Sequence, residues 1–247
     1  RLVANENPYG PAPGVIRALA EFEEYHFHPE YEPLSEAVAA YARVTPDKVV
    51  LSNGADEMID LLIRLFVEPG EVVVTTPPTF SMYRFYARVN RCQMLTVPLR
   101  EDFSLDVEAV ETAVRRAMND RAEGGQGFPR VLFLVSPGNP SGRAIPPAAI
   151  KQLLGLSIMV VVDEAYIEFG GQSVVDLLRD HQNLVILRTF SKWAGLAGLR
   201  LGYGLMASSL AQDVERIRPP YNVNAAAMVA ALATFDDMDA VPISDLR

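Results

Sequence analysis

Short apolar runs alternate along the chain with longer segments in which the apolar residues have helical spacing. Several of these runs consist mainly of Val, Leu and Ile, which is typical of strands that are buried on both faces. Strands are predicted at Val49–Leu51, Val72–Thr75, Gln93–Val97, Val131–Val135, Ile158–Val162, Leu184–Arg188 and Leu201–Met206.

Helices are predicted between these strands. After the first strand, Ile59, Leu62 and Phe66 fall near one helical face, and Pro69-Gly70 ends the helix. The alternation predicts an α/β fold, with a mainly parallel sheet and helices on both of its faces. Gly124-Gly125-Gln126-Gly127 predicts a flexible loop. The predicted helices are Asp56–Phe66, Leu105–Met118 and Ala148–Leu154.

The composition is that of an ordinary globular protein. The 247 residues, 49% of them apolar, suit one large α/β domain with room for the start of a second. The net charge of -9 argues against nucleic acid as the main partner, because binding a phosphate backbone requires clustered Lys and Arg. Cys92 is the only cysteine, so no disulfide can form within the chain, and we interpret it as a small buried hydrophobe.

The sequence also bears on localisation. No apolar run approaches the length that spans a bilayer, and the N-terminal residues lack the basic and apolar regions of a signal peptide. We therefore expect a cytoplasmic protein without a membrane partner.

Chemically useful side chains follow four of the predicted strands. Asn139 follows one strand, Asp163 and Tyr166 follow the next, and Lys192 follows a third. Ser52-Asn53-Gly54-Ala55-Asp56 follows the first strand and opens a helix. Taken alone, each has an ordinary explanation: a turn asparagine, a helix-capping aspartate, a surface lysine or a capped helix start. Their coincidence is informative, because ligands of such sheets bind at the carboxyl ends of the strands.

This set of groups matches the needs of pyridoxal phosphate. Its aldehyde needs a lysine amine, such as that of Lys192, and its ring nitrogen needs a carboxylate, such as that of Asp163. Its 3-oxygen needs donors such as Asn139 and Tyr166. Its phosphate needs N–H groups at a helix N-terminus, with a hydroxyl or an Arg. Phe80 could lie flat against its ring, although a role in the core is about as plausible for Phe80 alone.

At these residues the chain resembles the fold type I pyridoxal-phosphate-dependent aminotransferases, most closely the histidinol-phosphate aminotransferases. The matching stretches follow the family's order and cover nearly the whole chain. They are Ala4-Asn5-Glu6-Asn7-Pro8-Tyr9-Gly10, Asn53-Gly54-Ala55-Asp56-Glu57, Ser136-Pro137-Gly138-Asn139-Pro140-Ser141-Gly142, Val162-Asp163-Glu164-Ala165-Tyr166, Arg188-Thr189-Phe190-Ser191-Lys192, Gly195-Leu196-Ala197-Gly198-Leu199-Arg200 and Pro220-Tyr221-Asn222-Val223-Asn224.

The resemblance implies a role for each site residue. Lys192 would form the Schiff base to pyridoxal phosphate and move the proton, Asp163 would pair with the ring nitrogen, and Tyr166 would complete the catalytic set. The remaining residues implied to bind the cofactor are Gly54, Ala55, Asp56, Phe80, Asn139, Ser191 and Arg200. The implied reaction, a step of histidine biosynthesis, converts histidinol phosphate and 2-oxoglutarate into imidazole acetol phosphate and glutamate. A homodimer is implied as well.

The sequence departs from the family before Pro29, where His28 replaces a Tyr that reaches the cofactor phosphate of the neighbouring subunit. We assign His28, with Asn7 and Tyr9, to substrate contacts. His26 and His28 could be read as a metal pair, but no third ligand has a sensible spacing, so no metal site is expected.

The predicted domain organisation also follows from the resemblance. Residues 1–30 form an N-terminal segment and part of a small domain, residues 31–220 form the cofactor-binding large domain, and residues 221–247 form a helix that leads toward a truncated small domain. Pro219-Pro220-Tyr221 marks the passage between the last two. Family members continue into a C-terminal small domain that supplies an Arg for the substrate's anionic group. We therefore expect the chain to be a fragment.

Four other functions stay open at this point. A threonine-phosphate decarboxylase or an aromatic amino acid aminotransferase would share the same cofactor residues. An inactive aminotransferase-like binding module is a reading from another class, and the presence of Lys192, Asp163 and Tyr166 argues against it. A nicotinamide-dependent dehydrogenase ranks low, because no Gly-x-Gly-x-x-Gly follows a strand.

Overall fold

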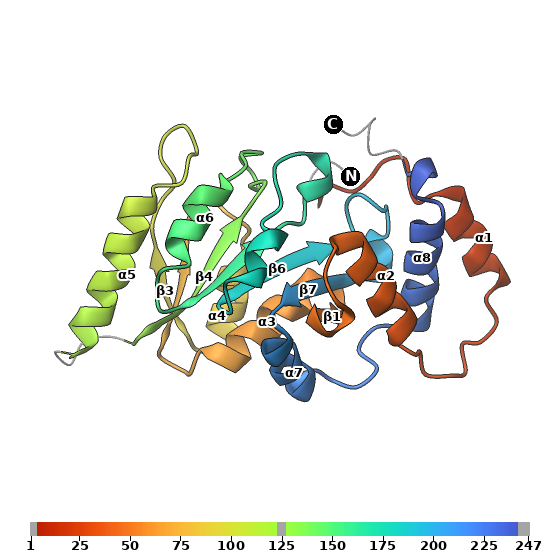
Figure 1. Ribbon diagram of the computed structural model, residues 1–247, viewed down its shortest axis with the longest axis horizontal. Helices are drawn as coiled ribbons and strands as arrows, with labels where there is room; N and C mark the ends of the chain where they lie inside the picture. Colours follow the sequence, from red (N-terminus) through yellow and green to blue (C-terminus); the bar gives the residue numbers. More distant parts are fainter. Residues whose placement is uncertain (1–3, 123–126, 242–247) are drawn as a thin grey trace.

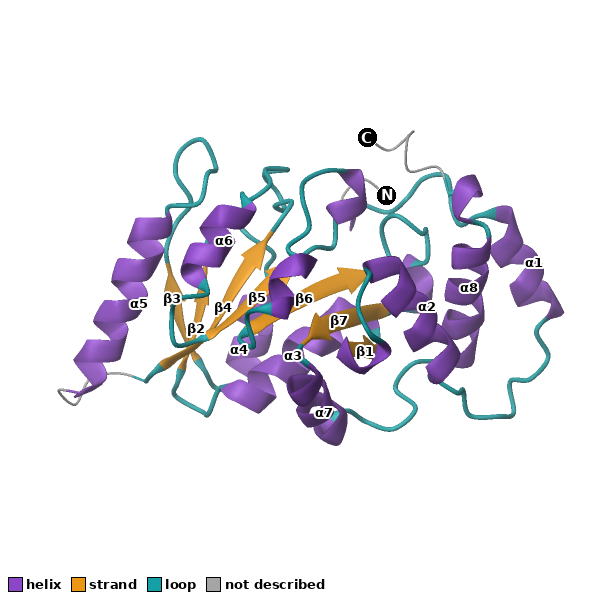
Figure 2. Ribbon diagram, viewed as in Figure 1, coloured by secondary structure: helices purple, strands orange, loops and turns teal. Residues whose placement is uncertain are grey.

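The computed structural model describes residues 4–122 and 127–241, and a seven-stranded sheet forms the centre of this part of the chain (Figures 1 and 2). Across the sheet the order is β1-β7-β6-β5-β4-β2-β3. Strands β6, β5, β4, β2 and β3 are parallel, whereas β7 is antiparallel to both of its neighbours. The strands are β1 (Val49–Ser52), β2 (Val72–Thr75), β3 (Gln93–Thr96), β4 (Pro129–Val135), β5 (Met159–Asp163), β6 (Leu184–Thr189) and β7 (Gly202–Met206). The predicted mainly parallel sheet is confirmed.

Helices surround this sheet (Figure 2). Helices α3, α5 and α6 confirm the three predicted segments, whereas α1, α2, α4 and α7 were not predicted. The helices are α1 (Pro13–Glu21), α2 (Glu32–Ala42), α3 (Gly54–Phe66), α4 (Met82–Val89), α5 (Val107–Ala122), α6 (Pro147–Leu153), α7 (Ser208–Ile217) and α8 (Ala225–Asp236). Of the predicted glycine loop, only Gly127 lies within the described residues.

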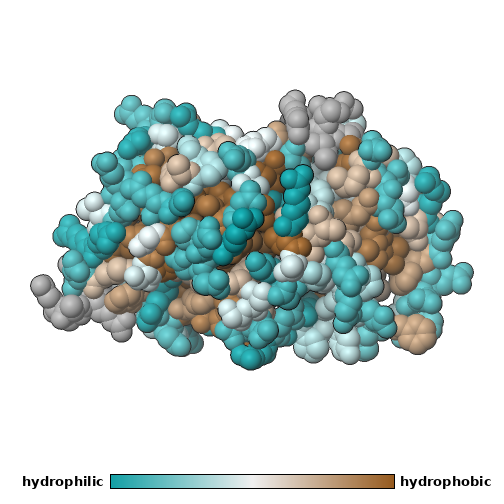
Figure 3. Space-filling view, viewed as in Figure 1, coloured by the Kyte–Doolittle hydropathy of each residue, from teal (hydrophilic) through white to brown (hydrophobic). Residues whose placement is uncertain are grey.

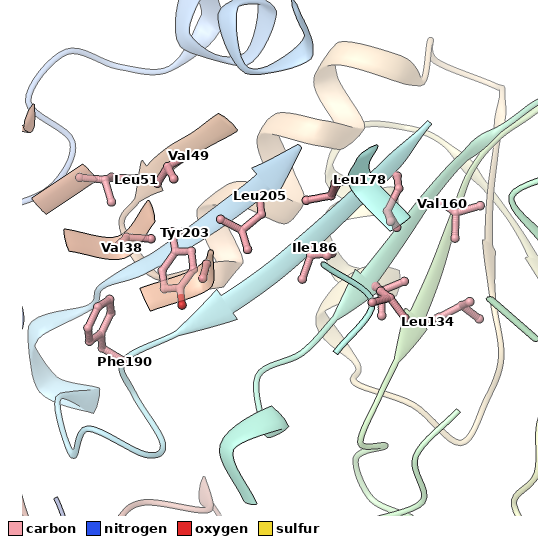
Figure 4. Close-up of a cluster of buried hydrophobic side chains, with 14 of the residues drawn as sticks. Val38, Val49, Leu51, Leu134, Val160, Leu178, Ile186, Phe190, Tyr203 and Leu205 are labelled. Atoms are coloured by element: carbon pink, nitrogen blue, oxygen red, sulfur yellow. The ribbon is translucent and has the colours of Figure 1, made fainter. Parts of the chain in front are cut away.

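Side chains of the strands point alternately to the two faces and form two buried clusters, as the period of a strand requires. On one face, Val73 and Phe133 pack with α3, α4 and α7. On the other, Leu134 and Ile186 pack with α2, α5 and α6, and Figure 4 shows part of this cluster. Burying one such side chain contributes about 1.5–3 kcal/mol, so helices on both faces hold the sheet rigidly.

Helices α1 and α8 lie side by side at one end of the molecule (Figure 1). The Gly14 N–H donates to Asp237 Oδ2 over 2.9 Å. Val15 of α1 and Ala227 of α8 belong to the same buried cluster as the sheet. The division into residues 1–30, 31–220 and 221–247 stays a prediction, and residues 242–247 lie outside the described part.

The surface in Figure 3 is mostly hydrophilic over the outer helices, with hydrophobic residues visible between them. Within residues 4–122 and 127–241, no helix combines the length and the apolar character needed to cross a bilayer.

Candidate active site

The strand directions bring the predicted residues to one edge of the sheet. The parallel strands β4, β5 and β6 end at this edge, and Asn139, Asp163 and Lys192 lie at or just beyond their ends. Strand β7 runs the other way and therefore begins there, which places Arg200, two residues before Gly202, at the same edge. A cavity of about 560 Å³ opens at this point.

All of the predicted cofactor residues except Gly54 line this cavity. The lining residues among them are Ala55, Asp56, Phe80, Asn139, Asp163, Tyr166, Ser191, Lys192 and Arg200. Gly54 lies behind Arg200, with a backbone φ of +75°, and a Cβ there would sit 2.6 Å from Arg200 Nη2. This position therefore requires glycine both for its conformation and for the space that the guanidinium occupies.

The amine of Lys192 reaches across the cavity to the N-terminal segment. Its Nζ donates to the Ala4 carbonyl over 2.7 Å and lies 5.8 Å from the centre of the Tyr166 ring. Burial and the nearby Arg200 guanidinium lower the pKa of the Lys192 amine, because both disfavour its charged form. An amine of this kind gives up its proton more readily than a surface lysine does.

Asp163 is a buried carboxylate at the cavity wall. Its Oδ2 accepts from Tyr83 Oη over 2.7 Å, and its Oδ1 accepts from the Ala165 N–H over 3.0 Å. Burial raises the pKa of Asp163 to about 6, although these two hydrogen bonds favour the ionised form. The carboxylate is thus largely ionised at neutral pH and can accept a bond from a cationic partner.

The N-terminus of α3 forms an anion site with the β6–β7 connection. Among the described residues, the Asn53 side chain does not cap α3, which leaves the first N–H groups of the helix available. Arg200 Nη2 donates to Asp56 Oδ2 over 3.0 Å, and its Nη1 lies 3.5 Å from Ser191 Oγ. A Cβ at Gly202 would lie 2.5 Å from the Ala55 nitrogen, so glycine lets the helix start approach the sheet.

Asn139 and Tyr166 line the side of the cavity that faces the N-terminal segment. Asn5 Nδ2 donates to Tyr166 Oη over 3.0 Å. Burial raises the pKa of the Tyr166 hydroxyl, while the bond from Asn5 lowers it. A neighbouring cavity of about 320 Å³ shares Asn5, Asn139 and Tyr166 with the first one. The edge of the sheet therefore offers room for a second ligand group beside the first.

The three residues assigned to substrate contacts do not line either cavity in the described part of the chain. Asn7 Nδ2 donates to the Trp193 carbonyl over 3.1 Å, and the exposed Tyr9 donates its N–H to Asn7 Oδ1 over 3.0 Å. His28 is exposed and stacks on Tyr221 with a ring distance of 3.8 Å. Their contacts with substrate stay a prediction.

Sequence reasoning did not assign a site role to two residues that contact predicted ones, Tyr83 and Asn5. Tyr83 lies three positions after Phe80, in the first turn of the unpredicted helix α4, and this nearness to Phe80 in the sequence is the available signal. Asn5 belongs to a stretch that resembles the family, but its contact with Tyr166 spans 161 residues of sequence.

The donor set fits pyridoxal phosphate. The cavity offers an amine with lowered pKa at Lys192, a buried carboxylate at Asp163, and an anion site of N–H groups, Ser191 and Arg200. A ligand with an aldehyde, a basic ring nitrogen and a phosphate would satisfy all three at once.

Comparison with known proteins agrees with this geometry. The family described as aminotransferase class I and II matches residues 1–242. The chain belongs to this family. Among curated relatives of this aminotransferase chain, the histidinol-phosphate aminotransferase of Roseiflexus castenholzii is 44% identical over 97% of the chain and 64% of its own length. A chloroplastic histidinol-phosphate aminotransferase of Nicotiana plumbaginifolia is also 44% identical, over 94% of the chain and 55% of its own length.

Solved structures of aminotransferases share the fold. The histidinol-phosphate aminotransferase of Sinorhizobium meliloti, in complex with pyridoxal-5'-phosphate, superposes with a TM-score of 0.86 and 28% identity, covering 98% of this chain and 65% of that one. The chain spans less than two thirds of the length of these relatives.

Proposed function

We propose that the chain carries a pyridoxal-phosphate-dependent transamination site that acts on histidinol phosphate and 2-oxoglutarate, with imidazole acetol phosphate and glutamate as products. The observation that carries this proposal is the convergence of the Lys192 amine, the Asp163 carboxylate and the Asn139 amide on one cavity. The substrate assignment is supported by relatives named histidinol-phosphate aminotransferase, which are 44% and 42% identical to this chain.

In this proposal different residues of the cavity bind different parts of the cofactor. When bound, pyridoxal phosphate supplies an aldehyde that condenses with amines and a ring that accepts negative charge from a substrate's α-carbon. Lys192 would hold the aldehyde carbon and Asp163 the ring nitrogen. Asn139 and Tyr166 would donate to the 3-oxygen, and Phe80 would lie against the ring. The phosphate would lie among Ser191, Arg200 and the N–H groups of Ala55 and Asp56.

The proton chemistry of the site follows from its charges. Because its pKa is lowered, Lys192 Nζ gives up its proton more readily, and the neutral amine could accept a proton from a substrate's α-carbon. Asp163 would carry a negative charge beside the ring nitrogen and so favour a positive charge there. Tyr166 would donate to the 3-oxygen, with its hydroxyl oriented by Asn5.

We also propose that two copies of the chain associate as a homodimer. Aromatic side chains of the N-terminal segment are exposed, including Tyr9, Tyr25 and Phe27, and Tyr221 lies exposed against His28. Exposed aromatic groups that lie close together, such as Tyr25 and Phe27 in one short segment, are typical of an interaction surface. Sedimentation of the purified chain tests the assembly, and a monomer at micromolar concentration would contradict it.

A substrate comparison tests the reaction. The chain, in its full-length form, is supplied with pyridoxal phosphate and 2-oxoglutarate and offered L-histidinol phosphate, phenylalanine or O-phosphothreonine. We expect glutamate to form much faster with histidinol phosphate than with phenylalanine. Equal turnover of phenylalanine would indicate an aromatic aminotransferase, and release of carbon dioxide from O-phosphothreonine would indicate a decarboxylase.

A spectroscopic test separates an enzyme from an inactive binding module. The protein with bound pyridoxal phosphate should show a visible absorption band that Lys192→Ala abolishes. Lys151→Ala, on the exposed side of α6, is the matched control and should keep the band. Loss of the band in both variants, or in neither, would refute the assignment of Lys192.

A further inference from the structure

Tyr83 places its hydroxyl behind the cavity rather than in it. The side chain comes from α4, is completely buried, and does not line the cavity among the described residues. Its ring stacks on Phe133 at 4.7 Å and meets Phe80 edge-on at 5.7 Å. Within this packing, Tyr83 Oη donates to Asp163 Oδ2 over 2.7 Å.

We propose that Tyr83 is a positioning residue that keeps the Asp163 carboxylate ionised and fixed in orientation for the ring nitrogen of the cofactor. This inference rests on the proposed role of Asp163. It adds a residue that does not contact the cofactor itself and that acts only through the Asp163 carboxylate. Tyr83 lies on α4, a helix that the sequence did not predict.

The hydrogen-bond inventory of Asp163 explains why one hydroxyl matters. Tyr83 holds Oδ2 and the Ala165 N–H holds Oδ1, so each carboxylate oxygen has one donor from the protein and keeps a lone pair for a further partner. A hydrogen bond from an O–H group to an ionised carboxylate is stronger than one to a neutral carboxylic acid, so the Tyr83 hydroxyl favours the ionised form of Asp163. Losing the hydroxyl leaves one oxygen of a buried carboxylate without this donor.

The surrounding charges do not replace that donor. Asp56 on α3 and Glu164 after β5 are both acidic, and each disfavours ionisation of Asp163. Lys192 beyond β6 is a cation that interacts with Asp163, and the Tyr166 phenol also interacts with it. When Lys192 is neutral, the two hydrogen bonds to Asp163 carry more of the stabilisation of its charge.

The first measurement uses the cofactor-free chain. Carbon-13 NMR of the aspartate side chains follows the titration of Asp163, which Asp163→Asn identifies by the loss of its signal. In Tyr83→Phe, which keeps the ring stacked on Phe133, we expect the Asp163 midpoint to move up by about one pH unit. Tyr203→Phe, an equally buried hydroxyl in the cluster on the other face of the sheet, is the matched control and should leave the midpoint unchanged.

The second measurement is the affinity for pyridoxal phosphate as a function of pH. If the Asp163 midpoint rises by one pH unit, the ionised fraction at pH 6 falls about five-fold. We therefore expect Tyr83→Phe to bind the cofactor about five-fold more weakly at pH 6 and almost normally at pH 8. In an Asp163→Asn background, the same substitution should change the affinity little, because the two residues act as one unit.

These results distinguish the possible failures. An unmoved Asp163 midpoint in Tyr83→Phe would overturn the role of Tyr83 even if the cofactor binds. A loss of affinity that is equal at pH 6 and pH 8, or that persists in Asp163→Asn, would also overturn it, because it would indicate a purely structural effect. Failure of the unsubstituted chain to bind pyridoxal phosphate would instead refute the proposed function, while the NMR titration would still decide the Tyr83 contact.

Discussion

Replacing Asp163 by Asn should stabilise the cofactor-free chain at alkaline pH, although it removes a group central to the proposed site. Asp163 is buried, and its pKa is raised to about 6 from an ordinary value of 3.8. Above that pH the folded chain must hold a desolvated charge, and an amide of almost the same shape has no such charge. The substitution should therefore raise the free energy of unfolding while it removes the proposed partner of the ring nitrogen.

The magnitude follows from the two pKa values of Asp163. A difference of about two pH units, at about 1.4 kcal/mol for each, corresponds to about 3 kcal/mol. Because the folded-state pKa is raised, the contribution of Asp163 to stability is complete below about pH 4 and is lost as the pH rises through about 6. Glu168, whose pKa burial raises to about 7, acts in the same direction, but it is present in both proteins and cancels in their difference.

Urea denaturation of both proteins without cofactor, at pH 4.5 and pH 8, measures this effect. We expect an advantage for Asp163→Asn of about 1 kcal/mol at pH 4.5 that grows to about 3 kcal/mol at pH 8. Saturating pyridoxal phosphate should reverse the order at pH 8, because the carboxylate then has a cationic partner. An advantage that does not depend on pH, or a less stable variant at pH 8, would refute the reasoning.

Three further predictions concern the residues around the site. Arg188→Met should lower the free energy of unfolding by about 3–5 kcal/mol, because it leaves the buried Glu164 carboxylate without its cation, and urea denaturation measures it. Arg200→Ala should weaken pyridoxal phosphate binding by about ten- to hundred-fold in equilibrium dialysis, through loss of a charged donor near Ser191. Gly202→Ala should lower both stability and cofactor affinity in the same assays, because its Cβ would displace the start of α3.

Each of these has an internal control. Adding Glu164→Leu to Arg188→Met should recover much of the lost stability, and no recovery would contradict the buried ion pair. Arg200→Ala should leave the urea midpoint nearly unchanged, since the side chain is 44% exposed. Gly198→Ala, where no atom lies within 4 Å of the added Cβ, should be neutral for stability, and a loss equal to that of Gly202→Ala would refute the steric argument.

Much of the sheet could be predicted because its strands are continuous apolar runs, as in Val131–Val135 and Leu184–Arg188. Helix α4 was missed because Met82–Val89 is short and contains three aromatic residues, which individually favour strands. Missing α4 also concealed Tyr83, whose contact with Asp163 spans 80 residues of sequence. Pairings of this kind depend on packing across the sheet, which no local pattern encodes.

The site itself was predictable to a different extent for different residues. Asn139, Asp163 and Lys192 follow strands, so the rule for sheet edges predicts that they meet. Arg200 precedes a strand and would lie at the opposite edge if that strand were parallel. Only the reversed direction of β7 brings it back, and a mainly parallel prediction does not say which strand is reversed.

The antiparallel pairing of β7 with β6 limits the separation between the Lys192 amine and the Arg200 guanidinium. The ladder pairs Thr189 with Gly202, so a slip of two residues would carry Arg200 about 7 Å along the strand and out of reach of Ser191. The hydrogen bonds between β6 and β7 therefore fix how far apart the backbones of Lys192 and Arg200 lie. The connecting turn adds its own requirement at Gly195, whose φ of +70° and close approach to the Gly10 backbone leave no room for a side chain.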